Sequence, residues 1–391
     1  MFICADESIF SMKVYRHRIY PTKAQERQMQ TCLFLAKNLW NDLLEHCKTF
    51  YNDYGKFPTR DGLQIMAKGS GFHSQVSQEV AHRIERAIWR YVKLKKSGKK
   101  AGFPRFKSID RMKSLHYPQY GNGFWLGEKL RITPFGEISI VKHREIKGKI
   151  KTLALKREMS GKWFACFCVE ERPVAKASNG KPKVGMDLGL KTLATFSDGF
   201  RVGNPRHLRK YAERLATLQR KMNGKKKGSK SRKKARRKIA LAYEKVRNTR
   251  LDFLHKTAHS LVNSYSLIGL EDLASQEMAE QKFGKQINDA GWGELANMLR
   301  YKAASAGCEV VFVNPKDTTR MCCKCGSKKG MPLETRTYCC EKCGNTMDRD
   351  LNAAHNILMR ATAGTAGSCA CGDNQKEELS VKQEAAGFSP Q

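Results

Sequence analysis

Two cysteine pairs near the end of the chain have the spacing of a metal site. Cys322 and Cys325 form one C-x-x-C pair, Cys340 and Cys343 form a second, and fourteen residues separate the pairs. Four thiolates at this spacing can surround one Zn²⁺ ion in a tetrahedron, with Zn–S distances of about 2.3 Å. The glycine after each pair permits the tight turn that such a site needs. We therefore predict one structural zinc ion whose closed coordination shell leaves no position for catalysis.

Two further cysteines, Cys323 and Cys339, lie in the same block and allow other sets of ligands. Only the first set keeps both C-x-x-C-Gly repeats, so it remains our prediction. A redox-active pair is the competing interpretation, and it would need a single C-x-x-C beside a thioredoxin-like unit. Six of the fourteen cysteines lie between Cys322 and Cys343, and this crowding indicates metal binding in a reducing compartment.

Three acidic residues from distant parts of the chain are candidate ligands for a harder metal. Asp187 lies in the apolar segment VGMDLGL, Glu271 ends the apolar segment SLIGLE, and Asp350 begins the segment DLNAAHNIL. A carboxylate in an apolar strand is costly unless it is paired or binds a cation. Together the three acids could hold two Mg²⁺ or Mn²⁺ ions, about 4 Å apart, for attack of water on a phosphodiester. Alternatively, Asp350 is a plain helix N-cap and Glu271 pairs with a nearby Lys or Arg.

Periodicity in the first third of the chain predicts a strand followed by helices. The strand covers residues 13–20, and a capping box from Thr22 to Gln25 then begins a helix. A second helix is predicted over 73–94, and we expect its Trp89, like Trp40 in the first helix, to lie in the core. Short strands separated by Gly and Pro follow over 108–172 and are typical of a small β-barrel.

Strands and helices alternate in the rest of the chain. The segments that contain Asp187 and Glu271 are predicted to be buried strands, and 309–315 is a third. Residues 206–265 have a helical pattern that the basic stretch 221–238 is expected to interrupt. Between Arg220 and Lys238, twelve of nineteen residues are Lys or Arg, which favours contact with nucleic acid over mere solubilisation.

The charge of the whole chain points to a polyanionic partner. Its 391 residues contain 73 Lys and Arg against 37 Asp and Glu, a formal net charge of +36. Such self-repulsion is hard to tolerate without phosphate or another acidic surface. The 40% share of hydrophobic residues argues against a disordered basic tail, and no apolar run is long enough to span a membrane.

The three acids and the cysteine block together resemble the TnpB family, the transposon-encoded RNA-guided DNA endonucleases related to the ancestors of type V CRISPR effectors. The resemblance rests on GMDLGLKTLATFSDG, GLEDL, the two cysteine pairs and DRDLNAAHNIL, in that order. The segments KVYRHRIYPTKAQE, GFPRFKS and RNTRLDFLHKTAH extend it over nearly the whole chain after Met12. The family pattern D-x-N-A-A selects Asp350 over its rival Asp348 as the third acid.

The resemblance implies an α+β multidomain fold. A RuvC/RNase H-like α/β nuclease domain would carry a zinc-knuckle insert, and an oligonucleotide-binding-like β-barrel would carry an inserted helical recognition domain. The expected division is a candidate over-annotated start (1–11), a barrel wedge-like domain (12–20 and 101–180), a helical recognition domain (21–100), a RuvC-like nuclease domain (181–316 and 346–362), a zinc-binding knuckle (317–345) and a disordered tail (363–391).

The resemblance also implies a function and its residues. Asp187, Glu271 and Asp350 would be the catalytic acids and bind Mg²⁺ or Mn²⁺, in addition to the zinc ion on the four cysteines. Residues 105–107 (Arg105, Phe106 and Lys107) would contact nucleic acid. The partners would be a guide RNA from the transposon end and double-stranded DNA beside a short motif. The protein would be located in the cytoplasm with the nucleoid, and no membrane partner is expected.

Three other functions stay open at this point. A nuclease-inactive, RNA-guided DNA-binding repressor should lack one or more of the acids, yet all three are present. A transposase-type DNA strand transferase would use the same acids on a transposon end without RNA, or a Tyr or Ser nucleophile for which we find no recognisable site. A zinc-ribbon nucleic-acid binder with incidental acids is the simplest alternative.

Overall fold

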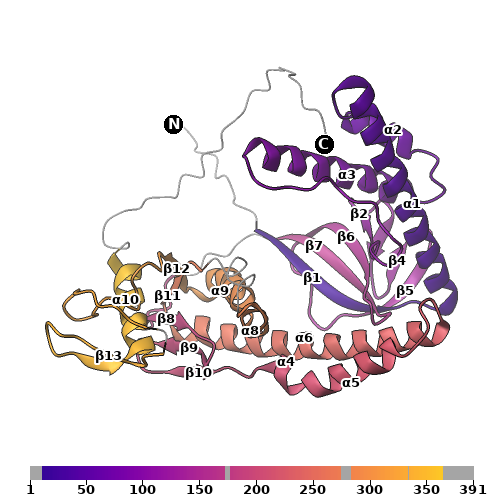
Figure 1. The fold of residues 1–391 in the computed structure, drawn as a ribbon. Helices are drawn as coiled ribbons and strands as arrows, with labels where there is room; N and C mark the ends of the chain where they lie inside the picture. The colour runs from indigo at the N-terminus through magenta and orange to yellow at the C-terminus, as the bar shows by residue number, and fades with distance from the viewer. Residues whose placement is uncertain (1–10, 172–176, 274–282, 333, 364–391) are drawn as a thin grey trace. The chain divides into compact units, whose positions relative to one another are not determined.

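The chain forms two compact units that divide beside Arg172. The computed structural model describes residues 11–171, 177–273, 283–332 and 334–363 (Figure 1). The predicted start over 1–11 and tail over 363–391 fall almost wholly outside the described residues. No helix in the described ranges has the length and apolar character that crossing a bilayer requires.

The first unit is built on a seven-stranded antiparallel sheet that curls into a nearly closed barrel. The strands follow the order β2-β6-β7-β1-β5-β4-β3. Their bounds are β1 Ser11–Tyr20, β2 Ser114–Tyr117, β3 Phe124–Leu126, β4 Leu130–Ile132, β5 Gly136–Val141, β6 Lys149–Arg157 and β7 Trp163–Glu171. The predicted strand over 13–20 and the predicted run of short strands are confirmed.

Alternation along β7 explains how the barrel encloses its core. Trp163, Ala165, Phe167 and Val169 are all at most 1% exposed, and the residues between them are less buried. A period of two places every second side chain on one face of a strand. The inward-facing set therefore fills the barrel and leaves the other face for solvent or a partner.

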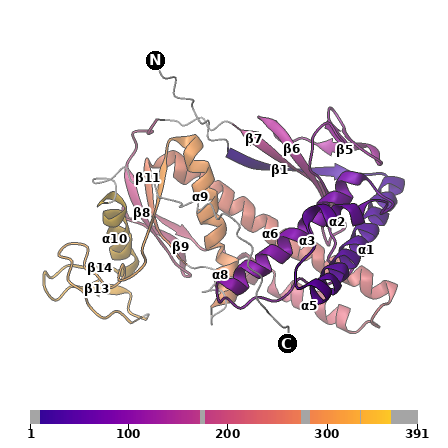
Figure 2. The ribbon, with the colours of Figure 1, turned by 90° about the horizontal axis from the view of Figure 1, so that it is seen from above.

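Three helices lie between β1 and β2 in the chain and pack on the same core (Figure 2). They are α1 (Lys23–Tyr54), α2 (Arg60–Ala67) and α3 (Ser74–Lys96). The capping box at Thr22 is confirmed, because its hydroxyl accepts from the Gln25 amide and the Gln25 side chain accepts from the Thr22 amide. The core prediction is right for Trp40 but wrong for Trp89, which is 62% exposed because it lies beside the buried stripe of α3.

The second unit contains a mixed five-stranded sheet of order β10-β9-β8-β11-β12. Strands β8, β11 and β12 are parallel neighbours, whereas β9 runs antiparallel to β8 and β10 runs antiparallel to β9. The bounds are β8 Lys183–Leu188, β9 Thr192–Phe196, β10 Arg201–Gly203, β11 Leu267–Glu271 and β12 Glu309–Val313. The predicted strands around both acids and over 309–315 are confirmed.

Helices cover both faces of this sheet, which accounts for the apolar character of its central strands (Figure 2). Val184 and Met186 of β8 share a core with α6 and α9, and α10 packs on the opposite face. The helices are α4 His207–Lys210, α5 Ala212–Asn223, α6 Lys230–Ser264, α8 Gly284–Ala290, α9 Trp292–Ala306 and α10 Arg349–Ala363. The expected interruption over 221–238 is shorter than predicted, because α6 already begins at Lys230.

The cysteine segment lies between β12 and α10 and contains one small hairpin. Its strands are β13 (Thr337–Cys339) and β14 (Thr346–Asp348), which pair antiparallel. Together with the barrel and the mixed sheet, this segment agrees with the predicted α+β multidomain fold class.

Candidate active site and metal centre

Two of the predicted acids lie near the carboxyl ends of neighbouring parallel strands of the second unit. In the register of β8 and β11, Gly185 pairs with Gly269, and Met186 pairs with Leu270. Asp187 and Glu271 are the next residue on each strand. Neighbouring strands lie about 4.8 Å apart, and residues at one register position share a face. The sheet therefore places the two carboxylates side by side at the carboxyl ends of its strands.

Helix α10 brings the third acid to the same face of the sheet. A Cβ atom built on Gly185 would lie 2.0 Å from the carbonyl oxygen of Ala354, and one on Gly269 would lie 2.8 Å from the Cβ of Ala361. Only glycines at these two paired positions let the helix approach so closely. Asp350 lies one turn before Ala354 on the same helical stripe, so the close contact directs it toward the end of β8, where its charge acts on Asp187.

The electrostatics of the three acids agree with this placement. Burial raises the pKa of Asp187 well above its usual range, and the negative charges of Glu271 and Asp350 raise it further. Burial also raises the pKa of Glu271, although a hydrogen bond from the Thr318 hydroxyl opposes the shift. Clustered carboxylates whose protonation is favoured are a site at which a divalent cation would replace the protons. Their hard oxygen atoms suit Mg²⁺ or Mn²⁺.

The carboxylates are not gathered as closely as the cysteines. Over the described ranges, the four cysteines are the one set of three or more Asp, Glu, His or Cys side chains found with ligand atoms close enough to hold a single ion. A pair of ions bridged by three acids needs a wider arrangement than one ion in a single shell. Glu271 and Asp350 thus each act electrostatically on Asp187, but the three acids do not form a compact single-ion shell.

Asp348, the alternative candidate for the third acid, makes other contacts. Its Oδ1 accepts hydrogen bonds from the backbone amides of Asp350 and Leu351 at 2.9 and 3.1 Å, so Asp348 caps the start of α10. Its Oδ2 lies 3.2 Å from the guanidinium of Arg201. These contacts satisfy the Asp348 carboxylate. The capping role considered for Asp350 therefore belongs to Asp348.

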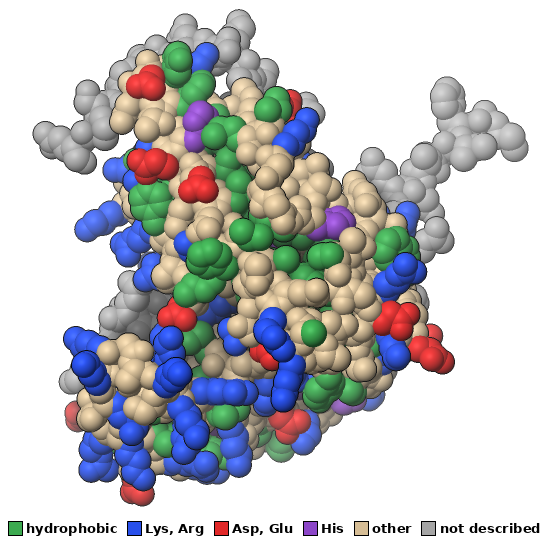
Figure 3. Space-filling view, turned by 90° about the vertical axis from the view of Figure 1, so that its right-hand side faces the viewer, with side chains coloured by type: hydrophobic (Ala, Val, Ile, Leu, Met, Phe, Trp, Pro, Cys, Tyr) green, Lys and Arg blue, Asp and Glu red, His purple; other side chains and the backbone are tan. Residues whose placement is uncertain are grey.

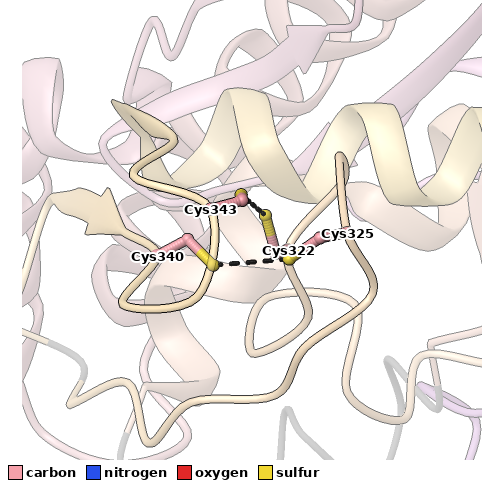
Figure 4. Close-up of side chains that lie close together, drawn as sticks. All are labelled: Cys322, Cys325, Cys340 and Cys343. Atoms are coloured by element: carbon pink, nitrogen blue, oxygen red, sulfur yellow. Dashed lines mark hydrogen bonds between the residues drawn. The ribbon is translucent and has the colours of Figure 1, made fainter.

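The four predicted cysteines meet in one cluster (Figure 4). The Sγ atoms of Cys322, Cys325, Cys340 and Cys343 all lie within 4.8 Å of one another. A hydrogen bond with the Ser327 hydroxyl lowers the pKa of Cys340 to about 6, and backbone amides act in the same direction. At Cys340 these contacts favour the thiolate, the form that binds metal. The donor set and its spacing fit a tetrahedral zinc ion.

The alternative registers of the cysteine centre do not form. Cys323 Sγ lies 3.7 Å from the sulfur of Met347 and outside the cluster, and Cys339 is exposed on β13. The glycines after the two pairs, Gly326 and Gly344, have φ angles of 72° and 67°. These left-handed conformations are the ones that glycine adopts without strain, as the C-x-x-C-Gly repeats predict.

Of the three predicted nucleic-acid contacts in the first unit, Lys107 is held against α1, whereas Arg105 and Phe106 are exposed. Asn41 of α1 accepts from the Lys107 amide at 2.8 Å and donates to the Lys107 carbonyl at 3.1 Å. The Lys107 ammonium lies 3.1 Å from the centre of the Trp40 ring, and burial, together with the charge of Arg83, lowers its pKa to about 7. Arg105 and Phe106 are exposed. Lys107 therefore fixes the segment, whereas its two predecessors face outward.

A second basic surface lies where α5 and α6 meet. We call the turn between α5 and α6, with the helix ends beside it, the α5–α6 tip. Lys and Arg side chains gather there, at the bottom of Figure 3. Arg232 closes the turn by donating to the carbonyls of Met222 and Lys225 at 3.0 and 2.8 Å. The remaining basic side chains of the tip are mostly exposed: Lys226, Lys227, Lys230, Lys233, Lys234, Arg236, Arg237 and Lys238.

Sequence reasoning missed the residues that support the acids. Thr318 and Arg201 contact Glu271 and Asp348, and the glycine pair of β8 and β11 sets the position of α10. The glycines were readable as close-approach positions inside apolar strands. Thr318 carried no signal, since a threonine before a cysteine block is commonplace.

Three family models match successive parts of the chain. They are described as "Helix-turn-helix domain" over 12–56, "Probable transposase" over 166–282 and "Cas12f1-like, TNB domain" over 292–357. In the structure the first range contains strand β1 and one long helix, α1. The last range contains the cysteine centre and most of α10.

Two relatives and one solved structure resemble most of the chain. A protein of Streptomyces pristinaespiralis named "Putative RNA-guided DNA endonuclease" is 31% identical over 95% of this chain and 96% of its own length. Another of Escherichia coli K12, with the same description and the name InsQ, is 29% identical over 80% of this chain and 79% of its own. The chain in "Cryo-EM structure of the Cas12f1-sgRNA-target DNA complex" is 14% identical, with a TM-score of 0.59 over 89% of this chain and 99% of that one, and so shares the fold.

Further relatives carry the name TnpB-like protein. The match over nearly the full length of both sequences, the order of the matched family models and the shared fold lead to one assignment. This chain belongs to the TnpB family.

Proposed function

We propose that this chain is a Mg²⁺-dependent, RNA-guided DNA endonuclease. The observation that carries the proposal is the placement of Asp187 and Glu271 at adjacent strand ends, with Asp350 brought to the same face by α10. The raised pKa of Asp187 supports a site that needs a cation. The names of two relatives that match 95% and 80% of this chain support the same activity.

Each acid has a part in the reaction we propose. Two bound Mg²⁺ ions would activate a water molecule and stabilise the charge that develops on the scissile phosphate. Asp187, Glu271 and Asp350 would hold these ions through their carboxylate oxygens. The Thr318 hydroxyl contacts one of the two carboxylate oxygens of Glu271.

The cysteine centre would stabilise the fold and the basic surfaces would bind nucleic acid, and neither would take part in the cleavage reaction. We assign a structural zinc ion to the four cysteines, because four protein thiolates fill its shell. Contact with RNA and DNA backbones is assigned to Arg105, Phe106 and the α5–α6 tip. Proteins of this type leave sequence choice to RNA–DNA pairing and hold the heteroduplex by its backbone, which requires many cations. The net charge of +36 meets that demand.

The domain roles follow from this assignment. We propose that the helical residues 21–100 and the barrel (12–20 and 101–180) recognise nucleic acid, and that 181–316 with 346–362 cut it. The guide RNA would come from the transposon end, and the target would be duplex DNA beside a short motif, in the cytoplasm with the nucleoid.

One experiment separates this proposal from its alternatives. The protein is purified from cells that carry its native locus, and the RNA that copurifies is sequenced. Duplex DNA matching that RNA, with a randomised flank, is then incubated with the complex and Mg²⁺. A defined transcript and cleavage that Asp187→Asn abolishes support the proposal. Binding without cleavage would indicate a repressor, and joining of DNA ends without RNA would indicate a strand transferase.

A further inference from the structure

A single stripe of α10 holds the chain that leads from β12 into the cysteine centre. Asn352, Asn356 and Arg360 follow one another at intervals of four residues and therefore lie on one side of the helix. This side differs from the stripe of Asp350 and Ala354 that faces the sheet. The helix thus has two separate packing surfaces.

The two asparagines are fully buried and bind backbone atoms of the incoming segment. Asn356 Nδ2 donates to the carbonyls of Thr318 and Met321 at 2.8 and 2.7 Å. Asn352 donates to the Met321 carbonyl at 2.7 Å and accepts from the Cys323 amide at 3.0 Å. Both asparagines have an exposed fraction of 0%. Buried amide groups are costly without such partners, so these contacts define one position for the segment.

Arg360 holds the beginning of the same segment. Its guanidinium donates to the carbonyls of Asn314 and Lys316 at 2.7 and 2.8 Å. The backbone from 314 to 323 is consequently fixed at both ends by side chains of one helix. Thr318 lies inside this fixed stretch and is 1% exposed.

The hydroxyl of Thr318 has one proton and two acceptors within reach. It contacts an oxygen of Glu271, and the Pro315 carbonyl lies 3.0 Å away. A carboxylate is the stronger acceptor because its charge strengthens the bond. The proton therefore goes to Glu271 and restricts the rotation of that carboxylate.

We propose that Thr318 is a positioning residue for the metal site of the proposed nuclease, and that the α10 asparagines hold it in place. The inference rests on the proposed function, because it concerns the same acids. Thr318 would fix one oxygen of Glu271 so that the other faces the divalent ion. Partners of this kind contribute about 10- to 100-fold to metal affinity when the ligand they orient is otherwise free to turn.

The test compares Thr318→Val, which keeps the shape and removes the hydroxyl, with Thr318→Ser, which keeps the hydroxyl. Thr319→Val makes the same change at the next, partly exposed position and serves as the matched control. Mn²⁺ binding to each purified variant is measured by electron paramagnetic resonance, and binding to Asp187→Asn gives the background from other sites. Melting temperature and zinc content report on folding.

We expect Thr318→Val to bind Mn²⁺ about tenfold or more weakly, and Thr318→Ser and Thr319→Val to stay within about twofold of the parent. The Mg²⁺ concentration for half-maximal cleavage should rise by the same factor. Parental Mn²⁺ affinity in Thr318→Val would overturn the inference, as would equal loss in Thr318→Ser. A parent protein that binds Mn²⁺ at the acids but cuts no guided target would instead count against the proposed function.

Discussion

Replacing Gly185 by alanine should separate α10 from the sheet and disable the acid cluster. The new Cβ would lie 2.0 Å from the Ala354 carbonyl oxygen and 2.5 Å from the Leu358 amide nitrogen. Both atoms belong to the helix backbone, so neither can turn aside as a flexible side chain would. To reach an ordinary contact of 3.4 Å, the helix would have to retreat by about 1.4 Å.

This retreat has two measurable costs. Overpacking a well-filled interior typically lowers the free energy of unfolding by about 1–3 kcal/mol. For a unit of this size, that loss corresponds to a melting temperature roughly 2–12 °C lower. Because Asp350 moves with the helix, the three carboxylates lose their alignment. A misplacement near 1 Å can reduce a catalysed rate about 100-fold.

The assay is single-turnover cleavage of a guided target, at a temperature where circular dichroism shows the variant folded. Gly203→Ala is the matched control, because Gly203 ends β10 of the same sheet and a Cβ there meets nothing within 4 Å. We expect the control to cut at the parental rate and to melt at nearly the parental temperature. Parental stability together with full activity in Gly185→Ala would refute the argument that close approach of α10 builds the site.

Three further predictions concern the acids and the cysteine centre. Asp187→Asn and Glu271→Gln should abolish cleavage but retain guide RNA, measured by filter binding, whereas Asp252→Asn on the exposed face of α6 should cut normally. Asp187→Asn should also raise the melting temperature at pH 7 without added Mg²⁺. The pKa of Asp187 is raised in the folded protein, so its charge destabilises the fold above that pKa and the gain should shrink as the pH falls through it. Cys340→Ser should lose zinc and melt earlier, with Cys339→Ser on the exposed β13 position as the control; equal zinc content in both would contradict the assigned ligands.

Local patterns in the sequence were sufficient for most elements and for the cysteine cluster. Strands β8 and β11 are short apolar runs with an acid at or next to the last residue, and the spacing of the cysteine pairs is itself a geometric constraint. Such signals depend on neighbours in the chain, and periodicity reports them directly. The exposed position of Trp89 was not predictable in this way, because it borders the buried stripe of α3 and one step around the helix decides its burial.

What the sequence could not provide is the relation between distant segments. Asp348 and Asp350 both lie at the start of α10, and only the capping geometry shows that Asp348 is occupied by the backbone. The register of β8 against β11, which pairs Gly185 with Gly269, is likewise a long-range property. The roles of the three acids stay predictions, since their placement supports metal binding without testing it.

Without a bound cation, the three acids destabilise the fold of the second unit. Contacts on both packing surfaces of α10 offset this destabilisation. Like charges and burial favour protonation of Asp187, so without a cation the cluster opposes folding. On one surface, Ile357 and Ala361 pack against the sheet at Gly269. On the other, the buried asparagines hold the segment that contains Thr318. Because the cysteine centre precedes α10 directly, a metal ion there would order the same helix. Displacement of α10 should therefore destabilise the cysteine segment and misalign the three carboxylates at the same time.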